Sequence, residues 1–327
     1  MTIDSFLQRE IDVGSFAGAS YAIGSYEAIE RTGALGNAVS VPLRIPASQE
    51  TIYDCASLTK PLVTTTLILQ AVAEKRLSLD DEYRGFAFRE LLTHTTGLKA
   101  WLPLYASGDY LATIEREGRE CARGERVIYS DLNFVLLFHA LRELEGDYIE
   151  MARRRIFEPI GLTDTCFNPP ASLRPRIAAT EWGQRHEVGM CANLAIDFTG
   201  FRRGLIWGAV HDGNSFHAGG TCGNAGLFAT AHDVFRTVQA LVRGDLVPLD
   251  LVHEATRTHA GDRGLGWQTR GPQLSTESFG HTGFSGTSVW VDQGRIMVLL
   301  TNRVHPCAAS IGMQKIRGSF HRLALTA

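Results

Sequence analysis

The chain has 327 residues, which exceeds one typical domain and predicts either one large domain with an insertion or two lobes sharing a cleft. Its 32 Lys and Arg residues nearly balance 35 Asp and Glu residues, and no basic run is interleaved with aromatics, so nucleic acid and acidic membranes are not expected partners. The first ten residues lack the pattern of a signal peptide, and no uncharged apolar stretch approaches about 18 residues, so a cytoplasmic location is expected.

The cysteines give no sign of a metal site or a disulfide framework. They form no Cys-x-x-Cys pair and stand at positions 55, 121, 166, 191, 222 and 307. Reduced, mostly buried thiols are therefore expected, with no metal and no cofactor. Cys55 lies two residues before Ser57, but no activating pattern surrounds it, so it is not expected to be catalytic.

The first predicted elements are a short amphipathic helix over 5–13 and a hairpin whose strands run near 17–23 and 28–35. An apolar run follows Ser57 and ends around residues 75–80. Because a helix that is apolar nearly all round is usually buried, this one is expected inside the protein.

Helical patterns dominate the middle of the chain, to about residue 200. They are clearest at 88–92, 109–117, 132–145 and 148–157. Residues 169–225 are instead rich in Gly, Pro and Asn without clear periodicity, which predicts long ordered loops of the kind that wall a cleft.

The last third begins with a predicted helix over 231–242 and closes with one over 308–325. Between them, β-rich patterns joined by a hairpin turn at residues 292–295 predict strands at 264–268, 277–281, 287–292 and 296–302. Strands near both ends with helices between them predict an α/β (α+β) fold. One lobe is built from 1–80 and 220–327, and a helical lobe with cleft loops occupies 81–219.

The first chemical motif is Ser57-Leu58-Thr59-Lys60, which places a hydroxyl and an amine one helical turn apart. Residues three apart on a helix share a face, with Cβ atoms roughly 5–6 Å apart, so the Lys60 amine can reach the Ser57 oxygen. A serine becomes a good nucleophile when a neighbour takes its proton, and a lysine can do so only if its pKa is depressed. Pro61 requires the helix to begin within about a residue of Ser57.

Two further motifs follow along the chain. Tyr129-Ser130-Asp131 stands at a loop-to-helix junction, where the phenol can point into a cleft. His281-Thr282-Gly283 ends a predicted strand, and Gly283 would let the backbone approach a ligand closely. Taken separately, each of the three motifs is also compatible with ordinary capping and packing.

Together and in this order, the motifs resemble the serine β-lactamase and penicillin-binding-protein superfamily, whose pattern is Ser-x-x-Lys, then Tyr-x-Asn or Ser-x-Asn, then Lys-Thr-Gly. The chain is most similar to the branch of class C β-lactamases, family VIII esterases and D-alanyl-D-alanine peptidases, where tyrosine leads the second motif. Residues 91–98 and 223–230 support the likeness, which extends from about Phe16 to the last helix. It implies a β-lactamase-like fold, with an antiparallel sheet flanked by helices and an inserted all-helical lobe.

The resemblance also implies roles. Ser57 is the nucleophile, Lys60 its proton partner, and Tyr129 the phenol or phenolate that shuttles the proton to the leaving group, helped by Lys60 and His281 as available cations. The backbone amides of Ser57 and Phe284 would form the oxyanion hole. The implied substrate-binding residues are Asp131, His281, Thr282 and Gly283.

Two residues depart from the family pattern. Asp131 replaces an amide, and if ionised it would pair with Lys60 and repel anionic substrates. His281 replaces the usual lysine, and its mostly neutral imidazole should weaken recognition of a substrate carboxylate. Both changes favour ester or amide substrates over efficient β-lactam turnover.

The sequence thus predicts a serine hydrolase that forms an acyl-Ser57 intermediate, first of all an esterase or amidase acting on a small-molecule ester, amide or peptide. A D-alanyl-D-alanine carboxypeptidase or muropeptide hydrolase ranks second and a class C β-lactamase third, with a penicillin-recognising sensor module as the non-enzymatic alternative. His94 is expected to be structural rather than part of a Ser-His-Asp triad. His211, Asp212 and His217 either line the cleft or order its loops.

Overall fold

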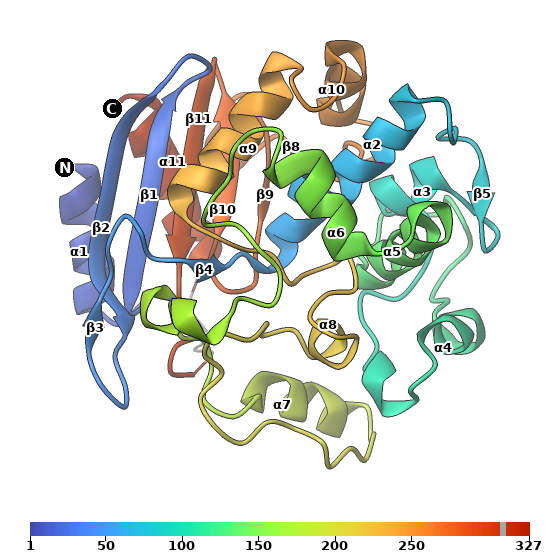
Figure 1. The fold of residues 1–327 in the computed structure, drawn as a ribbon, viewed down its shortest axis with the longest axis horizontal. Coiled ribbons are helices and arrows are strands. Elements are labelled where there is room, and N and C mark those ends of the chain that lie inside the picture. Colours follow the sequence, from blue (N-terminus) through green and yellow to red (C-terminus); the bar gives the residue numbers. More distant parts are fainter. Residues whose placement is uncertain (308–311) are drawn as a thin grey trace.

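The computed structural model describes residues 1–307 and 312–327, built around a seven-stranded antiparallel sheet (Figure 1). Its strands are β1 (Gly18–Ser25), β2 (Ile29–Val39), β3 (Ile45–Pro46), β8 (Gln268–Thr269), β9 (Phe279–Thr282), β10 (Ser288–Asp292) and β11 (Arg295–Thr301). The spatial order is β3-β2-β1-β11-β10-β9-β8. Strands from the two ends of the chain therefore meet at the β1–β11 pair, where Ala19 lies opposite Thr301.

Helices cover both faces of this sheet (Figure 1). The helices of the described residues are α1 (Ile3–Asp12), α2 (Thr66–Ala73), α3 (Phe88–Thr93), α4 (Tyr110–Glu117), α5 (Asp131–Glu145), α6 (Tyr148–Ala152), α7 (Arg185–Asn193), α8 (Gly213–His217), α9 (Ala231–Arg243), α10 (Leu249–Thr256) and α11 (Met313–Leu325). α9 packs on β1 and β11 from one side, and α1 and α11 pack together on the other. Successive side chains of β11 accordingly point to opposite faces of the sheet. Val298 lies in the core under α9, and Leu299 lies in the core under α1 and α11.

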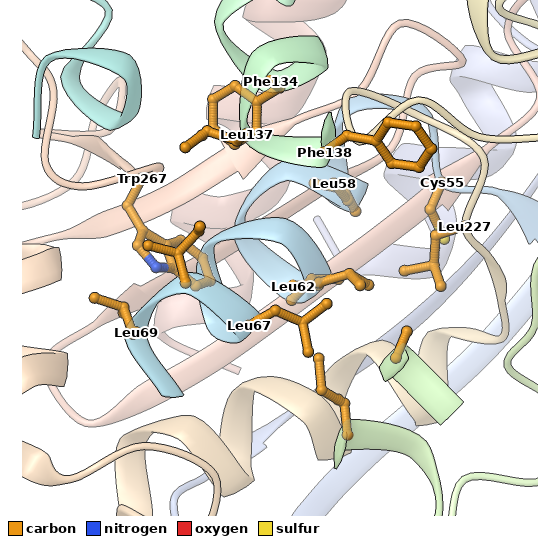
Figure 2. Packing of buried hydrophobic residues seen from close by; sticks show 14 of the residues in the cluster. Cys55, Leu58, Leu62, Leu67, Leu69, Phe134, Leu137, Phe138, Leu227 and Trp267 are labelled. Atoms are coloured by element: carbon orange, nitrogen blue, oxygen red, sulfur yellow. The ribbon is translucent and has the colours of Figure 1, made fainter. Parts of the chain in front are cut away.

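The helical run that carries the first motif changes type along its length. It begins as a 3₁₀ turn at Ala56–Leu58, continues as a π-helix at Lys60–Thr65 and becomes α2. Pro61 stands in the first turn of the π segment, where its missing N–H is tolerated. The run is buried as predicted, and Figure 2 shows its Leu62 and Leu67 in one cluster with Phe138 of α5 and Leu227.

Most predicted elements are confirmed, including the terminal hairpin and the buried helix. The turn between β10 and β11 is also confirmed, since Gln293 and Gly294 both have positive φ, as a two-residue hairpin requires. The strand predicted at 264–268 is wrong except at its end. The Gly264 amide donates to the carbonyl of Trp267 and Gly266 has φ +73°, so these residues form a turn before β8.

Smaller differences concern the middle and the end of the chain. The inserted region is mainly helical but also holds a ladder of β5 (Glu82–Tyr83) and β6 (Phe86–Ala87), while β4 (Tyr53–Asp54) pairs with β7 (Phe228–Ala229) beside the first motif. The predicted loops of 169–225 contain α7 and α8, and α10 was not predicted. The start of the predicted closing helix, 308–311, lies outside the described residues.

The division into lobes at residues 80 and 219 stays a prediction. Within the described ranges, no helix has the length and apolar character needed to cross a membrane.

Candidate active site

Ser57 and Lys60 lie against each other at the start of the buried helical run. Ser57 is partly exposed, whereas the Lys60 side chain is fully buried. The Lys60 Nζ atom donates to the Ser57 Oγ at 2.9 Å and to the carbonyl of Asn224 at 3.1 Å, and it forms an ion pair with Asp131 Oδ1 at 2.7 Å. An ammonium has three N–H donors and no lone pair, so three surrounding oxygens fit the charged form of Lys60.

The protonation of Lys60, which the sequence alone leaves open, is set by its neighbours. Burial lowers the pKa of Lys60, but the charge of Asp131 and the oxygen of Tyr129 outweigh burial and raise this pKa above its ordinary value. The condition under which Lys60 would act as a free-amine base is therefore not met, because the carboxylate of the second motif stabilises the ammonium. Burial raises the pKa of Asp131 in turn, while Lys60 opposes that rise.

The ring of Tyr129 lies near two cations. It precedes α5, whose N-cap is Ser130. The Lys60 Nζ lies 5.1 Å and the Arg263 Cζ 5.0 Å from the centroid of the Tyr129 ring. The phenol oxygen is buried and makes no hydrogen bond to any described residue. The phenol oxygen is therefore available to exchange a proton with a substrate or with Ser57, and the two cations lie near the ring.

His281 is buried in β9 and lies 5.8 Å, centroid to centroid, from the Tyr129 ring. Its Nδ1 lies 2.9 Å from the carbonyl of Thr282, while its buried Nε2 has no hydrogen-bond partner in the described part of the chain. Burial and the nearby charges of Lys60 and Arg263 lower the pKa of His281 well below its ordinary value. The prediction of a neutral imidazole is supported, and His281 is not a second cation for Tyr129.

Gly283 joins the third motif to the segment that carries Ser57. A Cβ atom at this position would lie 2.6 Å from the carbonyl oxygen of Cys55, which only glycine avoids. The Thr287 hydroxyl also donates to that carbonyl, at 3.0 Å. The next residue, Phe284, has a backbone amide that donates to none of the described residues, while its carbonyl accepts from Arg303 Nε at 2.6 Å.

Two cavities meet at Ser57. Both are lined by Ser57, Tyr129, Asp131 and Phe284. One, of about 210 Å³, has apolar walls that include Trp101 and Met190. The other, of about 570 Å³, adds residues from the third motif, strand β8, helix α11 and the segments next to them: Arg263, Gln268, His281, Thr282, Gly283, Arg303, Gly312, Met313, Gln314 and Arg317. The predicted site residues are thus brought together, with Lys60 beneath them.

Sequence reasoning did not identify three arginines that line the larger cavity, Arg263, Arg303 and Arg317. Arg317 donates from Nη2 to the carbonyl of Gly283 at 2.5 Å, yet it forms no ion pair with a carboxylate of the described residues. Burial and the neighbouring Arg303 lower the pKa of Arg317 to about 9. The available signal was its place on α11, where Gln314 and His321 share its face at helical spacing.

The alternative nucleophile and the alternative base are both structural. Burial raises the pKa of Cys55 well above its ordinary value, which leaves an inert thiol. His94 is buried at a helix C-cap, where its Nδ1 accepts from the Ser130 amide at 3.0 Å and lies 3.2 Å from Asn133 Nδ2. It orders the turn that carries Tyr129, as the prediction of a structural histidine states.

The loop histidines divide between the two roles left open by the sequence. His211 and Asp212 line the smaller cavity, and His211 Nε2 lies 3.0 Å from the Glu181 carboxylate. His217 instead packs against Tyr105, with ring centroids 5.0 Å apart.

Comparison with known proteins agrees with this geometry. A family model described as Beta-lactamase matches residues 22–315. A putative D-alanyl-D-alanine carboxypeptidase of Escherichia coli (strain K12) is 30% identical over 314 residues, 80% of this chain and 71% of that protein. Two solved structures share the fold: a penicillin-binding protein homologue from Pyrococcus abyssi (TM-score 0.73, 19% identity, 98% of this chain and 77% of that chain) and EstCE1, a hydrolase with promiscuous acyltransferase activity (TM-score 0.73, 17% identity, 98% and 96%).

The resemblance drawn from the three motifs is therefore confirmed. Because the family model spans most of its length, the chain belongs to the β-lactamase family of serine hydrolases and penicillin-binding proteins.

Proposed function

We propose that this chain is a serine carboxypeptidase, which forms an acyl-enzyme at Ser57 and releases a leaving group that carries a free carboxylate. The observation that carries this proposal is Arg317, a guanidinium that lines the same cavity as Ser57 and has no carboxylate partner among the described residues. Arg317 is partly buried, and a cation withdrawn from water without a counter-ion is unfavourable unless a ligand supplies the charge. A planar guanidinium matches a carboxylate in both charge and shape.

This proposal reverses the ranking that the sequence favours. The neutral His281 was expected to weaken recognition of a carboxylate, but Arg263 and Arg317 supply positive charge to the same cavity from other elements. The name of the Escherichia coli relative, a putative D-alanyl-D-alanine carboxypeptidase, points to the same substrate class. Because Tyr129 stands first in the second motif, we compare the proposed site with that of the class C branch.

In the proposed mechanism, Ser57 attacks the acyl carbon and Tyr129 relays its proton. A neutral phenol can accept the Ser57 proton while it donates its own to the departing nitrogen, so atoms balance without a separate base. Lys60, held as an ammonium by Asp131, stabilises negative charge on the Ser57 and Tyr129 oxygens. In this mechanism the backbone amides of Ser57 and Phe284 bind the oxyanion, and Thr282 and His281 contact the leaving group.

Hydrolysis of the acyl-enzyme follows the same route in reverse. Water occupies the place of the leaving nitrogen and attacks the acyl carbon. Tyr129 accepts a proton from this water and donates its own to Ser57 Oγ as the ester bond breaks.

An esterase acting on short acyl groups is the second candidate. The smaller cavity favours it, since Trp101 and Met190 give its acyl side an apolar wall that does not require a peptide.

The test compares two peptides that end in D-Ala-D-Ala and differ only in a free or an amidated C-terminal carboxylate, beside p-nitrophenyl butyrate and nitrocefin. A carboxypeptidase should cleave the free-carboxylate peptide with a kcat/KM roughly 10–100-fold above that of the amide, the range of a charge-assisted hydrogen bond. The Ser57→Ala variant should cleave neither and should not react with a fluorophosphonate. Equal cleavage of the two peptides, or ester cleavage alone, would refute the carboxypeptidase assignment.

A further inference from the structure

A third cavity lies beside the larger of the two cavities that meet at Ser57, between α11 and the strands β8–β10. Its volume is about 270 Å³, and one face of α11 contributes Gln314, Arg317 and His321 to its lining. Gln268 and Thr282 line both this cavity and the cavity of Ser57. A leaving group that contacts Thr282 could therefore extend a side chain into this cavity, which Ser57 does not line.

This cavity contains buried polar atoms with no partner. His321 is 1% exposed, and its Nε2 lies 2.8 Å from the Ser288 hydroxyl. The His321 Nδ1 and the Arg317 Nε are both buried without a hydrogen bond to any described residue. Unsatisfied buried polar groups are rare in folded proteins, and a built cavity at the same place indicates that a ligand or ordered water satisfies them.

The two unpaired nitrogens, His321 Nδ1 and Arg317 Nε, can both be hydrogen-bond donors, which suits an anionic ligand. Burial and the charge of Arg317 lower the pKa of His321 to about 3, so its ring is neutral. If the Ser288 hydroxyl donates to Nε2, the proton of the neutral ring is on Nδ1, the ring nitrogen that has no partner among the described residues. The Nδ1–H, the Nε–H of Arg317 and the positive charge of its guanidinium then suit an acceptor-only group such as a carboxylate.

The size of the cavity fits a short side chain. One water takes about 30 Å³ of liquid volume, so this space holds several non-hydrogen atoms. Trp290 and Leu274 in its lining suit the methylene groups that would carry the carboxylate.

We propose that this cavity is a specificity pocket for a second carboxylate, carried by the side chain of the leaving residue, and that the preferred leaving residue is a dicarboxylic amino acid such as glutamate. The inference rests on the proposed carboxypeptidase function and adds the identity of the released residue. The residue's own terminal carboxylate stays in the cavity of Ser57.

The test uses three peptides that are identical except for the last residue: D-alanine, D-glutamine or D-glutamate. Because glutamine and glutamate are nearly isosteric, the ratio of their kcat/KM values isolates the charge. The native protein should prefer the glutamate peptide by roughly 10–100-fold. His321→Phe should lower this ratio, because only Arg317 then remains to bind the second carboxylate, and should leave cleavage of the D-alanine peptide unchanged.

Two variants on α11 provide a pair that does not disturb the core. Gln314 is exposed and lines the cavity, so Gln314→Glu should lower the glutamate-to-glutamine ratio. Lys315 is exposed, lies outside both cavities, and its change to glutamine shifts the net charge by the same amount, so Lys315→Gln should retain the ratio. A native ratio near one, or a ratio unaffected by both His321→Phe and Gln314→Glu, overturns the proposal. Cleavage of none of the peptides refutes the proposed function and the specificity pocket together, whereas cleavage of the D-alanine peptide without a glutamate preference refutes only the pocket.

Discussion

Replacing Asp131 by asparagine should move the titration of Lys60 toward neutral pH. Asparagine is nearly isosteric and keeps an oxygen near Lys60, but it removes the carboxylate that lies 2.7 Å from the ammonium. A hydrogen bond to a charged group contributes roughly 1.5–3 kcal/mol, and 1.36 kcal/mol corresponds to one pKa unit, so the pKa of Lys60 should fall by about 1–2 units.

The sign of the effect on rate separates two mechanisms. In the native protein the pKa of Lys60 is raised above 10.5, so the ammonium persists far into the alkaline range. If catalysis requires the ammonium, as proposed, the native rate declines only at high pH, and the decline of the variant begins at a pH lower by about 1–2 units. If Lys60 acts instead as a free-amine base, Asp131→Asn should raise the rate at neutral pH.

The assay is the rate at which a fluorophosphonate labels Ser57, measured from neutral to alkaline pH. Thermal unfolding at each pH confirms that the variant is folded, since loss of one member of a buried pair is destabilising. Asp212→Asn is the matched control: it removes a nearby charge in the smaller cavity, and asparagine still caps α8. A faster neutral rate in Asp131→Asn, or the same shift in Asp212→Asn, would refute the assignment of Lys60 as an ammonium held by Asp131.

Three further predictions concern other parts of the site. Arg317→Gln should lower kcat/KM for a free-carboxylate peptide by roughly 10–100-fold and leave the amidated peptide unchanged; an equal loss for both would remove Arg317 from carboxylate recognition. Gly283→Ala places a Cβ 2.6 Å from the Cys55 carbonyl, so kcat should fall by about 10²-fold as the strand end moves, and native-like kcat would show that this contact is not critical. The pKa of His321 is lowered to about 3, so the unfolded state binds the extra proton between about pH 6.5 and 3. Urea unfolding should accordingly show a loss of stability across that range that is about 4–5 kcal/mol smaller in His321→Phe than in the native protein, and an equal loss in the two proteins would assign it to other groups.

The nucleophile and its neighbours could be predicted because their geometry is local. Ser57 and Lys60 are fixed by helical spacing, and Tyr129 by its place immediately before the N-cap of α5. The three meet because the buried helical run packs on α5, and both surfaces are apolar in the sequence. Where spacing and burial determine a position, the sequence is sufficient.

The charges around that nucleophile could not be predicted in the same way. Asn224 offers a backbone carbonyl to Lys60, which no side-chain pattern indicates. Arg317 reaches Gly283 from a helix 34 positions further along the chain, by tertiary packing alone. The direction of the Lys60 pKa also depends on the 2.7 Å contact with Asp131, because burial by itself acts in the opposite direction.

Charge is balanced differently on the two sides of Ser57. Lys60 is compensated inside the protein by Asp131, so its ammonium is maintained whether or not substrate is present. Arg317 has no such partner in the described residues, and burial disfavours its charge. A carboxylate that binds only the folded state would then stabilise it by RT ln(1 + [L]/Kd), about 2.7 kcal/mol at a hundredfold excess over Kd. An N-acetylated D-amino acid should therefore raise Tm more than its amide does, and this difference should disappear in Arg317→Gln.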